Sequence, residues 1–358
     1  MQRIIGGKRA ATAKATNPAA PPAAPAVTRV QVDEGSEGQR LDNFLIKLLK
    51  GVPKTHVYRV IRSGEVRVNK GRAAADTRLA LGDEVRVPPV RVADRSAEPV
   101  APAREFPVVF EDEHLIAVDK PAGVAVHGGS GVSFGVIEQL RQARPAAKFL
   151  ELVHRLDKET SGLLLVAKKR SALTALQDQF RSRETGKTYA ALVQGTWPAS
   201  RKVIDVALHK FLTAEGERRV RTVAVLRQAQ DERGLPSTGS GRSEKQAQAG
   251  RRSITLVKVA KKFDHFTLLD VTIKTGRTHQ IRVHLAHEGH PIAGDEKYGD
   301  FALNKALSKG EAVPGHRFER MFLHARRLRF EHPATGEVIE LEAALPAECE
   351  DLLHALSS

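Results

Sequence analysis

Apolar side chains recur at helix or strand spacing through the first part of the chain, between residues that end such elements. Residues 28–89 contain five short periodic segments separated by turn residues. Gly51 and Pro53 divide the two segments that have helical spacing. The predicted helices are 40–50 and 55–64, and the predicted strands are 28–32, 65–69 and 84–88. We expect one small domain of two helices and short strands here.

The pattern after residue 105 contains more strands than helices and no regular alternation of the two. Strand 162–168 is nearly all apolar, so it is predicted to be central and buried. Ser171 is the expected N-cap of the helix after it. The predicted strands are two within 107–123 about an acidic turn, then 162–168, 188–195, 254–260, 265–273 and 336–343; the helices are 135–143, 172–182 and 278–288. We predict an α+β fold with a mixed, mainly antiparallel sheet and flanking helices over residues 106–353.

Three segments lack this periodicity. Residues 1–27 are rich in Ala and Pro, carry Lys and Arg but no acid, and are too Pro-rich for the amphipathic helix of a transit peptide, so we expect a disordered basic tail. Residues 90–105 have the composition of a linker. Residues 226–250 are polar and rich in Gly and Ser, which predicts a mobile insertion, with a basic RNA-contacting loop as the alternative.

The formal net charge of +15 indicates a polyanionic partner, either nucleic acid or an anionic membrane surface. No run of about 18 apolar residues is present, which excludes a spanning helix and favours nucleic acid. Cys349 is the only cysteine, so an internal disulfide is excluded and a reducing, cytoplasmic location is expected. The ordinary structural interpretation of Cys349, as a small and partly buried side chain, is favoured.

Basic side chains gather on the second predicted helix and the turn that follows the next strand. Lys54, Arg59 and Arg62 lie opposite the apolar positions of that helix, and Lys70 lies in the turn. An ordinary solvated helix face would look the same, since exposed Lys and Arg are common. The excess charge of the chain favours contacts with nucleic acid. These four residues are therefore the candidate RNA contacts of the small domain.

The small domain resembles an S4-type RNA-binding domain. The segments that carry the likeness are 40-RLDNFLIKLL-49, 55-THVYRVIRSGEVRVNKGR-72 and 79-LALGDEVRVP-88. The resemblance implies a surface that grips structured RNA through its shape and its phosphates.

The densest polar cluster is 154-HRLDKETSG-162, which runs directly into the predicted buried strand. An Asp in a loop at a strand start, among His, Arg and Lys, is suited to acid–base or nucleophilic chemistry. A surface turn held by Asp, Ser and Thr side chains would have the same spacing. The spacing alone therefore leaves both interpretations of Asp157 open.

The wider string resembles the signature motif of the RluA-type pseudouridine synthases. The matching segments are 154-HRLDKETSGLLLVAK-168, 187-KTYAALVQG-195, 275-TGRTHQIRVHLAHEGHPIAGDEKYG-299 and 323-LHARRLRFEHPATGE-337. With the S4-like block, the likeness covers residues 28–353 apart from 226–250. The branch that it resembles most, judged from 168-KKRSALTALQDQF-180 and the matched segment 276–299, is the C-type branch, which modifies large-subunit (23S) ribosomal RNA in bacteria. The resemblance implies isomerisation of uridine by an aspartate with no cofactor.

By this resemblance Asp157 is the catalytic carboxylate. It would either attack the nucleotide covalently or remove the C2′ proton, and the sequence leaves both routes open. Arg282 maps to the family's basic partner, which would keep the carboxylate ionised and fix its direction through a bidentate pair. Spacing alone favours a surface helix residue at Arg282.

Two further roles follow from the same resemblance. Tyr189 occupies the aromatic position that meets the uracil, although packing in the core is the commoner fate of such a Tyr. Arg155 matches the residue that helps the target base leave its stack, and a plain phosphate contact is nearly as good an interpretation.

Two other residue groups carry no predicted chemistry. The histidines of 278–290 lack the ligand spacing of a zinc site, so no metal is expected; they are His279, His284, His287 and His290. Gly128, Gly129 and Gly131 indicate a flexible loop without phosphate-loop residues.

We expect a monomer that binds ribosomal RNA and no membrane. The rival hypotheses are the same chemistry on transfer RNA or other ribosomal sites, and a non-catalytic ribosome-assembly factor, against which the intact 154–162 cluster argues.

Overall fold

The computed structural model describes residues 26–90, 100–129, 134–213, 217–223 and 250–358. Most of the predicted tail and of the 226–250 insertion lies outside these ranges, as do residues 91–99 of the predicted linker and Gly131. The chain divides into two compact units, Met1–Ala97 and Glu98–Ser358. None of the described helices is long and apolar enough to cross a membrane.

The described part of the N-terminal unit, residues 26–90, has two short helices and a three-stranded antiparallel sheet of order β1-β3-β2. Its elements are β1 (Thr28–Gln31), α1 (Leu41–Leu48), α2 (Lys54–Arg62), β2 (Arg67–Val68) and β3 (Glu84–Val87). Val57, Val60 and Ile61 turn the apolar face of α2 into the core, as the spacing predicted. Asn69 and Lys70 both have positive φ, so Lys70 projects from a tight turn between paired residues.

Within the described residues of the C-terminal unit, a ten-stranded sheet forms the frame, and all but one of its strand pairings are antiparallel. The exception is β7 beside β14, so the predicted mixed, mainly antiparallel α+β fold is confirmed. The path is β4-β5-β7-β14-β8-β13-β12-β9, with β6 paired to β7 and β15 paired to β14. The strands are β4 (Val108–Glu111), β5 (Leu115–Lys120), β6 (Glu151–Leu152), β7 (Ser161–Ala167), β8 (Gly186–Gln194), β9 (Val203–Asp205), β12 (Ile254–Lys262), β13 (Phe266–Ile273), β14 (Leu323–Glu331) and β15 (Val338–Glu342).

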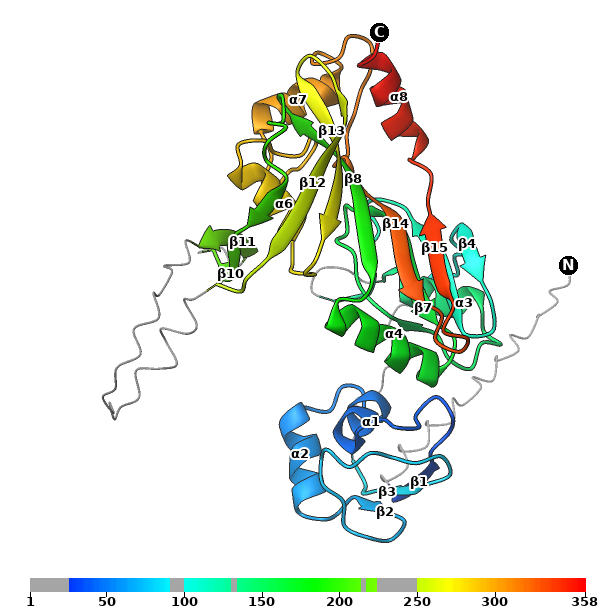
Figure 1. The fold of residues 1–358 in the computed structure, drawn as a ribbon. Coiled ribbons are helices and arrows are strands. Elements are labelled where there is room, and N and C mark those ends of the chain that lie inside the picture. The colour runs from blue at the N-terminus through cyan, green and yellow to red at the C-terminus, as the bar shows by residue number, and fades with distance from the viewer. Residues whose placement is uncertain (1–25, 91–99, 130–133, 214–216, 224–249) are drawn as a thin grey trace, which may run out of the picture. The chain divides into compact units, whose positions relative to one another are not determined.

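Helices cover this sheet, and a separate hairpin lies against one of them. Figure 1 shows α3 and α4 beside the β7–β14 part of the sheet, and α6 and α7 beside the β12–β13 part. The helices are α3 (Val136–Ala143), α4 (Arg170–Ser182), α6 (Gln280–His287), α7 (Phe301–Lys309) and α8 (Ala347–Ala355); the hairpin is β10 (Ala207–Leu212) with β11 (Arg218–Val223). The hairpin contacts α6 through β11.

Strand β7 is buried along its whole length because both faces of the sheet are covered there. Leu163 and Leu165 pack with α4 on one face, and Leu164 and Val166 pack with α3 on the other. The apolar run therefore predicted its central position correctly. Burying one such side chain stabilises the fold by roughly 1.5–3 kcal/mol.

Helix boundaries near polar residues were predicted less well. Helix α4 begins at Arg170 with Lys169 as its N-cap, so the predicted cap at Ser171 is wrong. Ser171 lies inside the first turn, where a serine side chain is an ordinary surface group. Helix α6 begins at Gln280, two residues later than predicted, because His279 adopts a left-handed conformation with φ 51°. Strand β14 was recognised only as a motif, since its alternation is broken by arginines.

Gly162, at the start of β7, should tolerate no side chain. Its φ is +107°, and a Cβ there would lie 2.4 Å from the carbonyl oxygen of Ala325 on β14. Gly162→Ala should therefore lower the free energy of unfolding by about 3 kcal/mol, measured by urea denaturation. Gly129→Ala is the control, because its added methyl would meet nothing closer than 4.0 Å. Equal stability of the two variants would mean that β14 does not limit the space at residue 162.

Candidate active site

The loop between β6 and β7 carries Asp157 and is fastened to the protein on both sides. The buried Lys120 ammonium donates to the carbonyls of Pro121, Val124 and Lys158 at 2.7, 2.8 and 3.0 Å. Only a protonated amine offers three N–H donors, although burial lowers the pKa of Lys120 to about 7. This tether fixes the main chain one residue after Asp157. Sequence reasoning gave Lys120 no role.

The start of the same loop is held by His154. Its Nε2 accepts a hydrogen bond from the main chain of Leu165 on β7 at 3.1 Å, and its ring stacks on Phe180 of α4 with centroids 4.6 Å apart. Burial, together with the nearby Lys187 charge, lowers the pKa of His154 to about 3. The imidazole is therefore neutral and acts as an acceptor that anchors the loop to the sheet.

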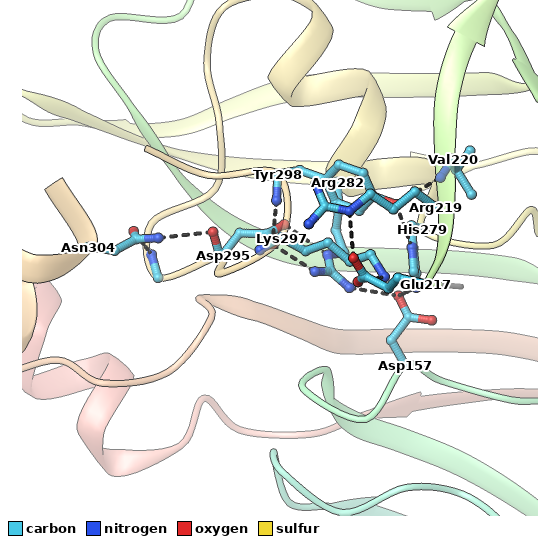
Figure 2. A network of polar contacts seen from close by, with 11 residues as sticks. Asp157, Glu217, Arg219, Val220, His279, Arg282, Asp295, Lys297, Tyr298 and Asn304 are labelled. Atoms are coloured by element: carbon cyan, nitrogen blue, oxygen red, sulfur yellow. Dashed lines mark hydrogen bonds and ion pairs between the residues drawn. The ribbon is translucent and has the colours of Figure 1, made fainter. Parts of the chain in front are cut away.

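The Asp157 carboxylate faces the first turn of α6. Its Oδ2 lies 3.5 Å from Nη1 of Arg282 and 3.9 Å from Nε2 of His279, and its side chain is 20% exposed (Figure 2). The structure thus brings the predicted carboxylate and its predicted basic partner together from segments far apart in the chain. One oxygen is oriented by α6, and the side chain remains open to a ligand.

Arg282 is only 7% exposed, so the surface-helix alternative is wrong. The expected bidentate pair with Asp157 is also wrong, because the guanidinium fork is taken by Asp295. Nε donates to Asp295 Oδ2 at 2.8 Å and Nη2 donates to Oδ1 at 2.7 Å. That bidentate geometry fixes the guanidinium plane and leaves Nη1 directed at Asp157 (Figure 2).

Asp295 is almost fully buried and was missed by sequence reasoning, although it stands within the matched segment 275–299. Burial would raise the pKa of its carboxyl, but the Arg282 hydrogen bonds and charge outweigh burial and the pKa is lowered. The main-chain N–H groups of Lys297 and Tyr298 also donate to its Oδ1. The sequence signal that could have found it is an acidic residue directly after the apolar and glycine run 291-PIAG-294.

Tyr298 and His279 complete the shell around Arg282. The guanidinium carbon lies 5.1 Å from the Tyr298 ring centroid, and the Tyr298 hydroxyl accepts from Val220 of β11 at 3.1 Å. That hydroxyl lies 2.8 Å from Nδ1 of His279, and burial lowers the pKa of His279 to about 4. The arrangement favours a neutral imidazole that accepts at Nδ1 and presents its Nε2 proton to Asp157. Arg282 therefore supplies the fixed positive charge of the site.

A cavity of about 580 Å³ opens beside Asp157. The four site residues predicted for the catalytic region all line it: Arg155, Asp157, Tyr189 and Arg282. Burial raises the pKa of the Tyr189 hydroxyl, so it stays protonated at neutral pH. Arg155 is exposed, so its side chain is accessible to a ligand at the cavity. A cavity of this size is large enough for a nucleotide-sized ligand.

The remaining predicted contacts lie in the N-terminal unit, on one helix and one turn. Lys54, Arg59 and Arg62 are exposed on α2, and Lys70 is exposed in the turn after β2. Their side chains are therefore available to a polyanionic partner, as the hydropathy pattern of α2 indicated.

The four histidines of the 278–290 region each have a different partner. His284 is buried against Thr255 and the carbonyl of Val206, whereas His287 and His290 contact Thr222 and the carbonyl of Gln194. Among the residues that the structure describes, no group of three or more His, Cys, Asp or Glu side chains could hold a metal ion. Cys349 is fully buried, whereas partial burial was predicted.

Comparison with known proteins places these features in context. A family model described as RNA pseudouridylate synthase matches residues 114–287, and an S4 domain model matches residues 39–85. The chain is 47% identical over 338 residues to ribosomal large subunit pseudouridine synthase C of Yersinia pestis, covering 93% of this chain and 96% of that protein. It is 46% identical to the protein of the same name from Escherichia coli K12, with 93% and 97% covered. A solved structure of human RNA pseudouridylate synthase domain containing 4 gives a TM-score of 0.52 at 25% identity, covering 70% of this chain and 92% of that one.

Asp295→Asn should destabilise the protein by about 3 kcal/mol, because an amide neutralises one member of a buried ion pair and leaves Arg282 without a full counter-charge. Urea denaturation measures the loss. Asp351→Asn on α8, where the carboxylate is exposed, should change the unfolding free energy by less than about 0.5 kcal/mol. If both variants unfolded at the same urea concentration, the Arg282–Asp295 pair would have no structural role.

Proposed function

The chain belongs to the RNA pseudouridylate synthase family, and we propose that it isomerises uridine to pseudouridine in large-subunit ribosomal RNA with Asp157 as its catalytic carboxylate. The observation that supports this assignment best is the convergence of Asp157, Tyr189, Arg155 and Arg282 on one cavity. These residues come from the loop before β7, from β8 and from α6. Their assembly gives each of them a distinct position relative to a bound nucleotide.

The reaction breaks the C1′–N1 bond of uridine, turns the base and joins C1′ to C5. The C5 proton then leaves, and N1 ends with a proton, so nothing is oxidised and no heavy atom is lost from the base. We propose that Asp157 starts this sequence, by attack on the nucleotide or by removal of the C2′ proton. Arg282 aims its Nη1 at Oδ2, which orients the carboxylate towards the ligand. The balance of this isomerisation requires no metal or cofactor.

Tyr189 and Arg155 would act on the base rather than on the sugar. Tyr189 stands on β8 in the cavity wall, where its ring can meet the uracil face and its protonated hydroxyl can reach the C5 edge. Arg155 is exposed beside Asp157 and would fill the space that the uridine leaves when it rotates out of its stack.

Recognition of the RNA would fall to the S4-like domain of residues 28–89, joined by the 90–105 linker to the catalytic domain of residues 106–353. Lys54, Arg59, Arg62 and Lys70 would contact phosphates of a folded RNA segment. The names of the curated relatives support large-subunit ribosomal RNA over transfer RNA as the substrate. We propose a monomer that works in the cytoplasm, where ribosomal RNA is found.

Asp157→Asn should abolish pseudouridine formation while leaving RNA affinity within about twofold. The amide keeps the shape of the side chain but neither attacks carbon nor accepts a proton, so a loss of roughly ten-thousandfold is expected. Release of tritium from a [5-³H]uridine-labelled large-subunit transcript measures the reaction, because the C5 hydrogen departs.

The matched control is Asp264→Asn, which removes an exposed carboxylate from the β12–β13 turn. It should release tritium at the wild-type rate. Tritium release by Asp157→Asn at a comparable rate would overturn the catalytic assignment.

The triple variant Lys54→Gln, Arg59→Gln, Arg62→Gln should bind the transcript more weakly and with a smaller salt dependence. Each lost phosphate contact lowers the slope of log Kd against log salt by about 0.9, so a total decrease of about two to three is expected. Filter binding over a series of salt concentrations provides the slope.

The control replaces three exposed lysines of the C-terminal unit: Lys258→Gln, Lys262→Gln and Lys305→Gln. This variant loses the same formal charge and should keep both the affinity and the slope. Equal losses in the two triple variants would remove the assignment of RNA binding to the S4-like domain.

A further inference from the structure

Beyond Asp157, the cavity continues along a wall of cationic side chains. They come from the end of α4, from β8 and from the loop before α6, and they are Arg181, Arg183, Lys187 and Arg277. Among the described residues that line this cavity, Asp157 is the sole carboxylate. The proposed chemistry of Asp157 and Tyr189 does not use these cations. Their clustering along the cavity therefore indicates another role.

Lys187 is the most unusual member, because it is a buried ammonium without an acidic partner among the residues that the structure describes. Its residue is 8% exposed, its Nζ donates to Thr185 Oγ1 at 3.1 Å, and it lies 5.0 Å from the centroid of the Phe180 ring. Its charged neighbours are Arg183 and Lys274, which are both cations. Burial, followed by these two charges, lowers the pKa of Lys187.

Lys120 is a buried ammonium with a structural role, and its hydrogen bonding can be compared with that of Lys187. There, three carbonyls accept from Nζ. At Lys187 one hydroxyl and an aromatic face take their place, which leaves donor capacity directed at the cavity. An incompletely paired buried charge is unfavourable, so an anionic ligand that enters the cavity would complete the pairing of Lys187.

Arg277 provides a second, independent sign of an anionic ligand. Its Nε is buried and has no hydrogen-bond partner within the described part of the chain. Buried donors are nearly always paired, and this one belongs to a guanidinium in the cavity wall. Guanidinium and ammonium groups are the side chains that bind phosphate in proteins.

The distance between Lys187 and Tyr189 along β8 shows which part of a bound nucleotide each residue could reach. The two residues are alternate positions on β8 and so lie on the same face, roughly 7 Å apart along the strand. A ligand whose base meets Tyr189 would therefore bring an adjoining part of its backbone within reach of Lys187.

We propose that Lys187 and Arg277 bind backbone phosphates of the RNA strand next to the target uridine. The inference rests on the proposed function for the identity of the ligand, and it adds a phosphate subsite inside the catalytic cavity. Binding is coupled to relief of an unfavourable buried charge, so Lys187 weakens the free protein and strengthens the complex.

The test compares Lys187→Met with Lys187→Arg and with Lys262→Met, an exposed lysine at the far end of β12. Lys187→Met should raise the Kd for a large-subunit ribosomal RNA transcript about tenfold and lower the salt slope by about 0.7–0.9. Its Tm should equal or exceed that of the wild type, because the uncompensated charge is gone. Lys187→Arg should keep the slope, and Lys262→Met should change neither quantity.

Arg277→Met tests the second cation in the same way. Its Kd should rise severalfold and its salt slope should fall by about 0.7–0.9, with no loss of Tm. A wild-type slope in both Lys187→Met and Arg277→Met would overturn the subsite. A Lys187→Met protein that loses Tm or does not fold, while the Lys187→Arg protein folds, would also overturn it, because the lysine would then be a structural residue.

Tritium release by the wild-type protein from the same transcript separates this proposal from the function on which it rests. Wild-type release together with unchanged slopes in both variants rejects the phosphate subsite alone. Absence of wild-type release rejects the proposed function, whereas the slopes still report whether Lys187 and Arg277 contact RNA phosphates.

Discussion

The buried pair of Arg282 and Asp295 is the interaction on which the rest of the site depends. Two hydrogen bonds of 2.7 and 2.8 Å fix the guanidinium plane, and only then does the third nitrogen have a defined direction towards Asp157. An arginine held by one contact would sample several rotamers, and the orientation of Asp157 would vary with it. Each of the two charges would be unfavourable if buried alone, so the pair has to be kept together for the site to keep its geometry.

The segment that follows α6 couples that pair to the surrounding elements. Asp295 accepts from two main-chain N–H groups of its own turn, and Asn304 of α7 donates to its carbonyl oxygen. Tyr298 joins Arg282, His279 and the β10–β11 hairpin through its ring and its hydroxyl. A change in these elements would therefore reach Asp157 through the Arg282 guanidinium group or through the His279 ring.

The sequence predicted the sheet class and the buried strand β7 because burial on two faces leaves an unbroken apolar run. It identified Asp157 as a catalytic candidate only through the wider motif, because the residue spacing alone fitted a surface turn equally well. It missed the Arg282–Asp295 pairing because side-chain pairing across a turn depends on the backbone path, and His279 shortened the expected helix through a left-handed residue. Ser171 failed as a cap for a similar reason: the backbone, not the residue type, decides where a helix begins.

The buried cations of the C-terminal unit differ in where their partners come from. Lys120 is satisfied by main-chain carbonyls and Arg282 by a carboxylate, so both are complete without a ligand. Within the described residues, Lys187 has a hydroxyl, an aromatic face and cationic neighbours, and Arg277 keeps one buried donor unpaired. The first two hold the catalytic loop and its carboxylate in place before substrate arrives. The other two gain their strongest partner only from an anion that enters the cavity. Lys120 and Arg282 therefore hold the site rigid, whereas Lys187 and Arg277 contribute affinity for the ligand.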